Sequence, residues 1–473
     1  MKQTRKAMRR IALVLVVAVC FTAFTYAVNV WYRSDEILNS AHNIRLSEAR
    51  KTTVEGTLYD SAGLALAESY TVGERHYIEN RAARLALCHT IGDTKGKVAS
   101  GIQQLYATTL LGLNDKTGAE QTLSSLLGET PVGNDITLTV SAELTAYAAS
   151  QFPSGSSGAL VLINYETGAI LAKLSLPVFD PADLPEVETG TYYFDRTVHT
   201  PYAYAPGSSF KIVTLAAALE NRPGVENETF HCEGVWQPFS GGHVYQCAGG
   251  TAHGTVSLKS AFTESCNKTF AYLAYEMGAP ALKQTAEAFG FNRDFAFEEI
   301  KADASRCLTD DTSSGELLQA GFGQGKTSVT PLHMALISAA IANGGDMMEP
   351  RLIRRISRHS GEELYTMTPR VYLHAADAET CRTIAEYMYE TVKSGTGTRA
   401  KVSGATVCGK TGSAETSNDK SVPTDAWFTG FLYGDDAHPY AIAVVVEKGG
   451  SGGSVAAPIA AKVLSKAIEM GLY

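Results

Sequence analysis

Apolar residues form strand-like runs near residue 160 and near the C-terminus, with helical runs between them. Residues 159–163 and 169–174 are two such runs joined by a turn sequence, which predicts a hairpin. The chain ends with three more strand-like runs and a helical pattern, at residues 405–408, 427–432, 440–446 and 458–470. This segregation of strands and helices predicts an α+β fold, in which five antiparallel strands form one sheet flanked by helices.

The middle of the chain has mostly helical patterns. A run at residues 212–219 is apolar on nearly every side, so this helix should be buried centrally. Residues 258–277 also have helical spacing, and Thr330 is a suitable N-cap for a helix that ends near residue 343. A further helix is expected at residues 381–392.

The first third of the chain has shorter elements. Residues 54–67 fit a strand, a turn and a second strand, and residues 81–87 and 98–113 have helical spacing. The turn residues at 131–135 mark a boundary. We therefore expect a small N-terminal domain at residues 33–132, of the pedestal or dimerisation type, and a larger domain at 133–473.

The extreme N-terminus has the pattern of a membrane anchor. Residues 11–32 carry no charge, and five cations precede them, namely Lys2, Arg5, Lys6, Arg9 and Arg10. A helix needs about 20 apolar residues to cross a bilayer, and preceding positive charge keeps the first ten residues in the cytoplasm. A signal peptide cleaved after Ala27 is the alternative, and both readings place the remaining chain outside the cytoplasm.

Composition changes this picture little. The chain has 473 residues, of which 45% are hydrophobic and 19% charged, which is typical of a globular protein. The net charge is −9, and beyond the N-terminus the basic residues are scattered. A basic nucleic-acid surface is therefore not expected.

The eight cysteines do not form a disulfide framework, because they are widely spread and Cys20 falls in the anchor. Cys232 and Cys247 bracket a loop and could form a disulfide, or they could be two small buried side chains. The nearby histidines are His231, His243 and His253. A zinc site is conceivable there, but the spacing fits no common zinc pattern, so no metal is predicted.

A candidate nucleophile follows the turn Pro206-Gly207. Ser208 and Lys211 are about one helical turn apart, at the start of the buried apolar run. A serine hydroxyl needs a base to take its proton, and a desolvated lysine can lose its charge and serve as that base. The helix start also supplies free N–H groups for an oxyanion. Ser208 is therefore the candidate nucleophile and Lys211 its base.

Two further motifs follow in order. Ser265 and Asn267 form Ser-x-Asn at a helical stretch, and Lys-Thr-Gly-Ser comes at the end of a strand, at Lys410, Thr411, Gly412 and Ser413. Taken alone, Ser265 could cap a helix, Asn267 could be a turn residue, and Cys266 between them is better explained as a packed side chain than as a nucleophile. The order Ser-x-x-Lys, Ser-x-Asn, Lys-Thr-Gly is the signature of penicillin-binding proteins and serine β-lactamases.

One motif points elsewhere. Residues 404–411 match the P-loop pattern literally, but a P-loop follows an apolar strand and precedes a helix. Here the residues between the glycines are themselves strand-like, and Gly412 and Ser413 follow the lysine. Nucleotide binding is therefore not expected, and no cofactor is predicted.

From about residue 133 to the C-terminus, the sequence resembles class B penicillin-binding protein transpeptidases. Besides the three motifs, the resemblance rests on residues 133–139, 158–168, 323–325, 329–332 and 395–398. Residues 54–67 resemble the family's N-terminal segment, although Glu55-Gly56 replaces the common Arg-Gly. The resemblance implies a serine D,D-transpeptidase that cross-links peptidoglycan stem peptides ending in D-Ala-D-Ala and that β-lactams inhibit covalently.

The resemblance also implies a role for each motif residue. Ser208 would form the acyl-enzyme and Lys211 would take its proton, while Ser265, with its hydroxyl between the two lysines, would relay a proton towards the leaving amine. Asn267 would orient Lys211 and bind the substrate amide, and Lys410 would add positive potential. The substrate carboxylate would be bound by Thr411, Gly412 and Ser413, and the oxyanion by the backbone N–H groups of Ser208 and Ser413.

The expected setting is the outer face of a bacterial cell membrane, with a single-pass anchor and a cytoplasmic N-terminus. A separate glycan polymerase of the SEDS family would be the partner. Three alternatives stay open, namely a D,D-carboxypeptidase, a membrane-anchored β-lactamase of the same fold, and a non-catalytic scaffold of the wall-synthesis complex.

Overall fold

Five antiparallel strands form the central sheet of the molecule. The computed structural model describes residues 2–32, 38–40, 43–114, 127–186, 192–199, 204–240, 244–417, 419 and 421–472. The strand order is β15-β16-β17-β5-β6, with bounds Val407–Ala414, Asp425–Leu432, Tyr440–Val446, Gly158–Asn164 and Ile170–Leu176. The predicted α+β fold with this sheet is confirmed.

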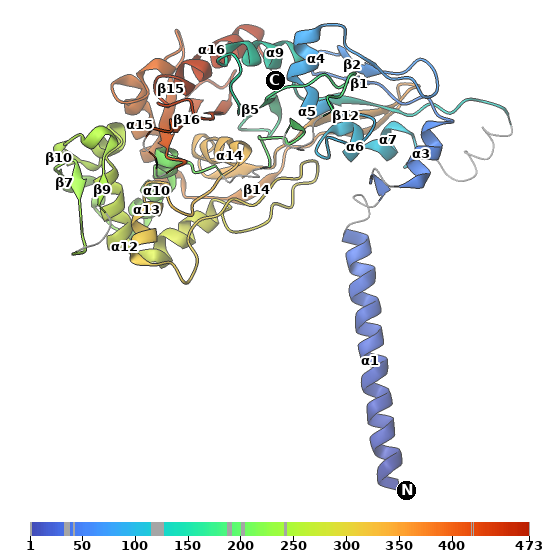
Figure 1. Ribbon diagram of the computed structural model, residues 1–473, viewed down its shortest axis with the longest axis horizontal. Coiled ribbons are helices and arrows are strands. Elements are labelled where there is room, and N and C mark those ends of the chain that lie inside the picture. Colours follow the sequence, from blue (N-terminus) through green and yellow to red (C-terminus); the bar gives the residue numbers. More distant parts are fainter. Residues whose placement is uncertain are drawn as a thin grey trace.

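Alternate side chains of these buried strands pack on two different helical layers, as expected for the period of a strand. In β5, Val161 and Ile163 belong to the core shared with α10 (Lys211–Asn221) and α14 (Pro331–Ala342). Leu160 and Leu162 belong to the core shared with α9 (Ala142–Gln151) and α16 (Ala456–Met470). Helices therefore cover both faces of the sheet (Figure 1).

A second sheet joins the N-terminal segment to a late part of the chain. Its order is β13-β12-β4-β1-β2-β3, with bounds Glu363–Thr366, Ile353–Arg358, Asn134–Leu138, Leu58–Tyr59, Ala65–Glu68 and His76–Tyr77. Strand β4 pairs in parallel with β1 and antiparallel with β12. The sequence pattern did not indicate the β12-β13 hairpin. The domain division after residue 132 stays a prediction, since this sheet contains strands from both sides of it.

Two regions predicted as continuous helices are interrupted. Ser208 lies in a 3₁₀ turn, η2 (Gly207–Phe210), and α10 begins only at Lys211. The helical stretch from residue 258 is split into α11 (Leu258–Thr263) and α12 (Asn267–Ala288). Both interruptions fall in the predicted motifs, and Cys266 is the N-cap of α12.

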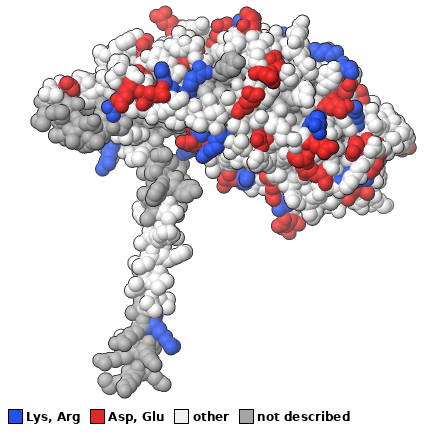
Figure 2. Space-filling model, turned by 180° about the vertical axis from the view of Figure 1, so that it is seen from behind, with Lys and Arg blue, Asp and Glu red and all other residues white. Residues whose placement is uncertain are grey.

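The N-terminal helix α1 (Lys2–Tyr32) projects away from the body of the molecule (Figure 1). Among the residues that the structure describes, no helix has the length and apolar character that crossing a membrane requires. The anchor therefore stays a prediction. Acidic and basic side chains are interspersed on the face shown in Figure 2, without a continuous basic patch.

The remaining elements connect these layers. The N-cap predicted at Thr330 is confirmed, because its side chain accepts a hydrogen bond from the N–H of His333. The other helices are α3 (Ile44–Arg50), α4 (Arg81–Ala86), α5 (Cys88–Ile91), α6 (Ile102–Leu105), α7 (Ala107–Leu110), α13 (Ser314–Ala320) and α15 (Ala378–Lys393). The short strands are β7 (Thr229–Cys232), β8 (Val235–Trp236), β9 (Tyr245–Gln246), β10 (Gly254–Ser257), β11 (Asp346–Met348) and β14 (Val371–His374).

Candidate active site

The start of α10, the turn between α11 and α12, and the edge strand β15 meet in one place. A Cβ on Gly207 would lie 3.2 Å from the Cα of Ala414, and a Cβ on Gly412 would lie 2.8 Å from the carbonyl oxygen of Pro206. Gly207 also has a φ of +54°, which favours glycine. The glycines of two predicted motifs therefore let the candidate nucleophile pack directly against β15.

The loop at residues 323–325 packs against the turn that contains Gly207. The N–H of Gly207 donates to the carbonyl oxygen of Gly323 over 2.9 Å. A Cβ on Gly323 would lie 2.0 Å from the carbonyl oxygen of Gly207, so only glycine fits there. This contact gives a physical reason for a glycine in the segment that the family resemblance singled out.

Lys211 is fully buried and reaches the turn between α11 and α12. Its Nζ donates to the carbonyl oxygen of Ser265 over 2.7 Å, to Ser265 Oγ over 3.2 Å and to Asn267 Oδ1 over 2.7 Å. Burial lowers the pKa of Lys211 to about 7. A substantial fraction of the amine is therefore neutral near pH 7 and able to accept a proton.

Ser208 is half-buried on the 3₁₀ turn that immediately precedes Lys211. Among the hydrogen bonds of the described residues, none joins Ser208 Oγ to Lys211 Nζ. Catalytic hydrogen bonds are often open before substrate binds. Ser208 and Lys211 therefore lie one turn apart, without a hydrogen bond between Ser208 Oγ and Lys211 Nζ.

Ser265 lies between the two lysines of the motifs. Its Oγ accepts from Lys211 Nζ over 3.2 Å and from Lys410 Nζ over 3.0 Å. Its φ of +60° is unusual for a residue with a side chain. A strained backbone that holds a hydroxyl between two amines is typical of a functional site.

Lys410 lies on β15 opposite Thr429 and is fully buried. Its Nζ donates to the carbonyl oxygen of Thr411 over 3.1 Å as well as to Ser265. Burial, and next the charge of Lys211, hold the pKa of Lys410 well below its usual range. A proton on one of these amines therefore disfavours a proton on the other.

Asn267 is the first residue of α12, and both the oxygen and the nitrogen of its side-chain amide form hydrogen bonds. Its Oδ1 accepts from Lys211 Nζ, and its Nδ2 donates to the carbonyl oxygen of Gln246 over 2.9 Å. These two bonds fix which end of the amide faces the lysine. The side chain can therefore orient Lys211, while its predicted contact with substrate stays a prediction.

The strand expected at residues 405–408 extends further towards the C-terminus. In the structure, β15 runs through the whole Lys-Thr-Gly-Ser motif. Thr411 Oγ1 lies 2.7 Å from Thr396 Oγ1. Ser413 is exposed, and its Oγ accepts from the N–H of Gly452 over 3.2 Å. Sequence reasoning missed Gly452, although its glycine-rich segment after the last strand was a visible signal.

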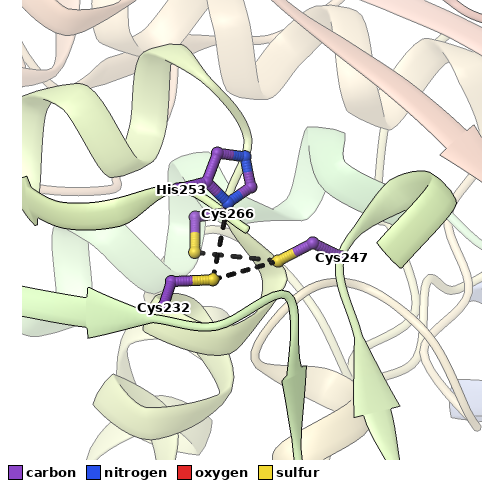
Figure 3. Close-up of side chains that lie close together, drawn as sticks. All are labelled: Cys232, Cys247, His253 and Cys266. Carbon is purple, nitrogen blue, oxygen red and sulfur yellow. Dashed lines mark hydrogen bonds between the residues drawn. The ribbon is translucent and has the colours of Figure 1, made fainter. Parts of the chain in front are cut away.

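The disulfide considered between Cys232 and Cys247 is not formed, and both thiols are free. Their sulfurs are 3.6 Å apart, whereas a disulfide bond measures about 2.05 Å. Two further side chains, His253 and Cys266, lie with them (Figure 3). His231 is exposed, and His243 lies outside the described residues.

Comparison with protein families gives one match. Residues 158–465 match the model of the penicillin-binding protein transpeptidase domain. The peptidoglycan D,D-transpeptidase PbpA of Mycolicibacterium smegmatis is 25% identical, over 98% of this chain and 99% of that protein. Stage V sporulation protein D of Bacillus subtilis is 30% identical, over 70% of this chain and 52% of its own length.

Solved structures agree in fold. Penicillin-binding protein A from M. tuberculosis, as a ceftriaxone acyl-enzyme complex, aligns with a TM-score of 0.80 at 25% identity, over 90% of this chain and all of that one. The D,D-transpeptidase domain of a peptidoglycan glycosyltransferase from Eggerthella lenta aligns with a TM-score of 0.73 at 30% identity, over 89% of this chain and 99% of that domain.

Proposed function

The chain belongs to the penicillin-binding protein transpeptidase family, and from this premise we propose a serine D,D-transpeptidase that cross-links peptidoglycan stem peptides and is acylated by β-lactams. The observation that carries the proposal is Ser265 Oγ between the two buried lysines Lys211 and Lys410, beside the turn of Ser208. Relatives named as peptidoglycan D,D-transpeptidases and a β-lactam acyl-enzyme of a structural neighbour support it.

The first chemical step is acylation. Neutral Lys211 takes the proton of Ser208, and Ser208 Oγ attacks the carbonyl carbon of the penultimate D-alanine. The backbone N–H groups of Ser208 and Ser413 stabilise the oxyanion that forms. Both segments already lie against each other at Gly207 and Ala414, which supports this arrangement.

Expulsion of D-alanine needs a proton on its departing amine. The Lys211 ammonium that forms in the first step can pass a proton through Ser265 Oγ, which already contacts both lysines. Lys410 adds positive potential that favours the substrate carboxylate, and the Thr411 and Ser413 hydroxyls bind that carboxylate. The peptide bond breaks, and an ester on Ser208 remains.

The second half of the reaction resolves this ester. The amine of another stem peptide attacks the ester carbonyl and gives up a proton, which returns to Ser208 as the ester bond breaks. A new amide bond then links two stem peptides. In the alternative D,D-carboxypeptidase, water takes the place of the amine.

The intact lysine site argues against a non-catalytic scaffold, because a scaffold has no need to bury two lysines. A β-lactamase differs from a transpeptidase in a fast hydrolysis of the acyl-enzyme. The lifetime of the β-lactam adduct on the enzyme therefore distinguishes a transpeptidase from a β-lactamase.

We also propose that α1 attaches the enzyme to the outer face of a bacterial membrane, with a SEDS-family glycan polymerase as partner. Exposed apolar side chains along α1 support attachment, among them Leu15, Val17 and Phe21. The polymerase rests on analogy within the family. Co-purification of the full chain with membranes, and its release after deletion of residues 2–32, would test the attachment.

The activity is tested with a synthetic stem pentapeptide ending in D-Ala-D-Ala, with and without an amine acceptor peptide. The expected result is released D-alanine and a cross-linked product that appears only with the acceptor, both lost in Ser208→Ala. Release of D-alanine without any cross-linked product would favour the carboxypeptidase. No release from a folded protein would overturn catalysis on this substrate.

A further inference from the structure

Three thiols and one imidazole converge beside the lysine site. Their ligand atoms, one from each of Cys232, Cys247, His253 and Cys266, all lie within 4.8 Å of one another, and the three cysteines are buried. Figure 3 shows the four side chains pointing toward a common centre. We call this group the cysteine–histidine cluster, and we propose that it is a tetrahedral zinc site.

The distances fit zinc better than a disulfide. With Zn–S of about 2.3 Å and Zn–N of about 2.0 Å, tetrahedral ligands place two sulfurs about 3.8 Å apart and sulfur and nitrogen about 3.5 Å apart. The observed separations are 3.6 Å for Cys232 and Cys247, 3.8 Å for Cys247 and Cys266, and 3.5 Å from Cys232 Sγ to His253 Nδ1. Only a small rearrangement is needed to seat the ion.

Two of the three sulfurs also accept a hydrogen bond from a backbone N–H. Gly234 donates to Cys232 over 3.4 Å, and Thr269 donates to Cys266 over 3.5 Å. N–H donors stabilise thiolate charge, and thiolates are the form that binds zinc. Thr269 is in the first turn of α12, where the helix dipole adds to this effect.

The surrounding fold needs such a cross-link. In the described part of the segment that carries three of the four ligands, the strands form the two-stranded pairs β7-β10 and β8-β9 and join no larger sheet (Figure 1). Two-stranded ribbons are marginally stable by themselves. The ion would tie the end of β7, the end of β9 and the start of β10 to the N-terminus of α12.

The same ion would stabilise the catalytic turn. Cys266 lies between Ser265 and Asn267, and Cys247 follows Gln246, whose carbonyl accepts from Asn267. Zinc binding would therefore clamp the two segments that position Asn267. This role adds to the proposed transpeptidase activity but does not depend on it, because metal content can be measured without any substrate.

Zinc is favoured over other metals by the ligand set. Three thiolates and one imidazole in a tetrahedral arrangement form a common structural zinc site, and four protein ligands leave no open position for chemistry. The ion is therefore structural rather than catalytic. Loading releases the thiol protons, so zinc affinity should fall at acid pH.

The test uses the full chain in detergent, purified under reducing conditions. Elemental analysis should find about one zinc per chain, and replacement by Co²⁺ should give thiolate-to-cobalt charge-transfer and tetrahedral absorption bands. His253→Gln and Cys232→Ser should weaken zinc binding at least about tenfold in competition with a chelator. The matched control is Cys381→Ser, a buried free thiol of α15 outside the cluster, which should keep full zinc content.

His253→Gln keeps the test decisive if a cysteine variant does not fold, because His253 is only half-buried. A chelator-treated wild-type chain should also exchange the amides of residues 264–268 faster than the zinc-loaded chain. Two results would overturn the proposal. One is a reduced, folded chain that takes up no zinc or cobalt, and the other is a disulfide among these cysteines in a parallel sample purified without reductant.

Discussion

The lysine site and the cysteine–histidine cluster share the turn at residues 264–267, yet they are held together in different ways. Lys211 and Lys410 reach the turn from α10 and β15, and among the described residues neither has a carboxylate partner. In the cluster, Cys232 and Cys266 each accept a hydrogen bond from a backbone N–H. The first site buries two cations without a counter-ion, and the second supplies backbone N–H donors to two of its sulfurs.

This contrast teaches what each site is suited to do. A base must be able to lose its proton, so burying a lysine without a counter-ion prepares it for catalysis. A metal ligand must keep its negative charge, so sulfur needs hydrogen-bond donors around it. The same turn can serve both because Ser265 and Asn267 face the lysines while Cys266, between them, belongs to the cluster.

The largest effect is expected from breaking the lysine site. Lys211→Met removes the base while keeping an apolar side chain of similar length, so acylation by penicillin should slow by roughly 10³–10⁴-fold. Stopped-flow competition with a fluorescent penicillin measures this rate. The control is Lys259→Met, which removes a half-exposed lysine on α11, and an equal loss in that variant would contradict the role of Lys211.

Removing the hydroxyl between the lysines should have a smaller effect. Ser265→Ala leaves both amines in place but breaks the proton relay, so the acylation rate should fall by about 10²-fold. The same competition assay measures it. An acylation rate within about twofold of wild type would show that protons reach the leaving group by another route.

The pH dependence sharpens the comparison further. The pKa of Lys211 is lowered to about 7, and only the neutral amine can take the proton of Ser208. The acylation rate should therefore rise with pH through about 7 and fall about tenfold for each unit below it. A rate that stays constant between pH 5.5 and 8.5, or that increases as the pH falls, would contradict the assignment.

The smallest effect concerns the backbone of the shared turn. Ser265 has a φ of +60°, which glycine adopts freely and alanine does not. Ser265→Gly should therefore have a free energy of unfolding about 1 kcal/mol higher than Ser265→Ala, although both lack the hydroxyl. Urea denaturation of the two variants measures the difference, and equal stabilities would show that the turn is not strained.

Much of the fold and of the active site could be predicted from the sequence, because the strands of the central sheet and the motifs each have a recognisable local pattern. The period-two and continuous apolar runs predicted all five strands, and the motifs named the residues that the structure brings together. The strand-like character expected between the glycines of the P-loop match is also present, since residues 407–411 belong to the strand β15.

The rest depends on contacts between distant segments. Strand β12 of the β12-β13 hairpin pairs with β4, which lies far earlier in the chain, and no local pattern indicates that partner. The sequence analysis considered zinc near Cys232, Cys247 and His253 but did not include Cys266, which joins them only after β7 pairs with β10 and α12 packs beside them. Spacing alone, read against common zinc patterns, argued for no metal.

The most direct test of the account is intact-protein mass spectrometry of the chain incubated with penicillin. We expect one stable adduct per chain that is lost in Ser208→Ala. It should persist in Ser209→Ala, which removes only a buried hydroxyl with no hydrogen-bond partner among the described residues. Rapid return to the unmodified mass with hydrolysed drug would indicate a β-lactamase. An adduct that survives in Ser208→Ala, or no adduct on a folded wild-type chain, would contradict the central claim that Ser208 is the acylated nucleophile.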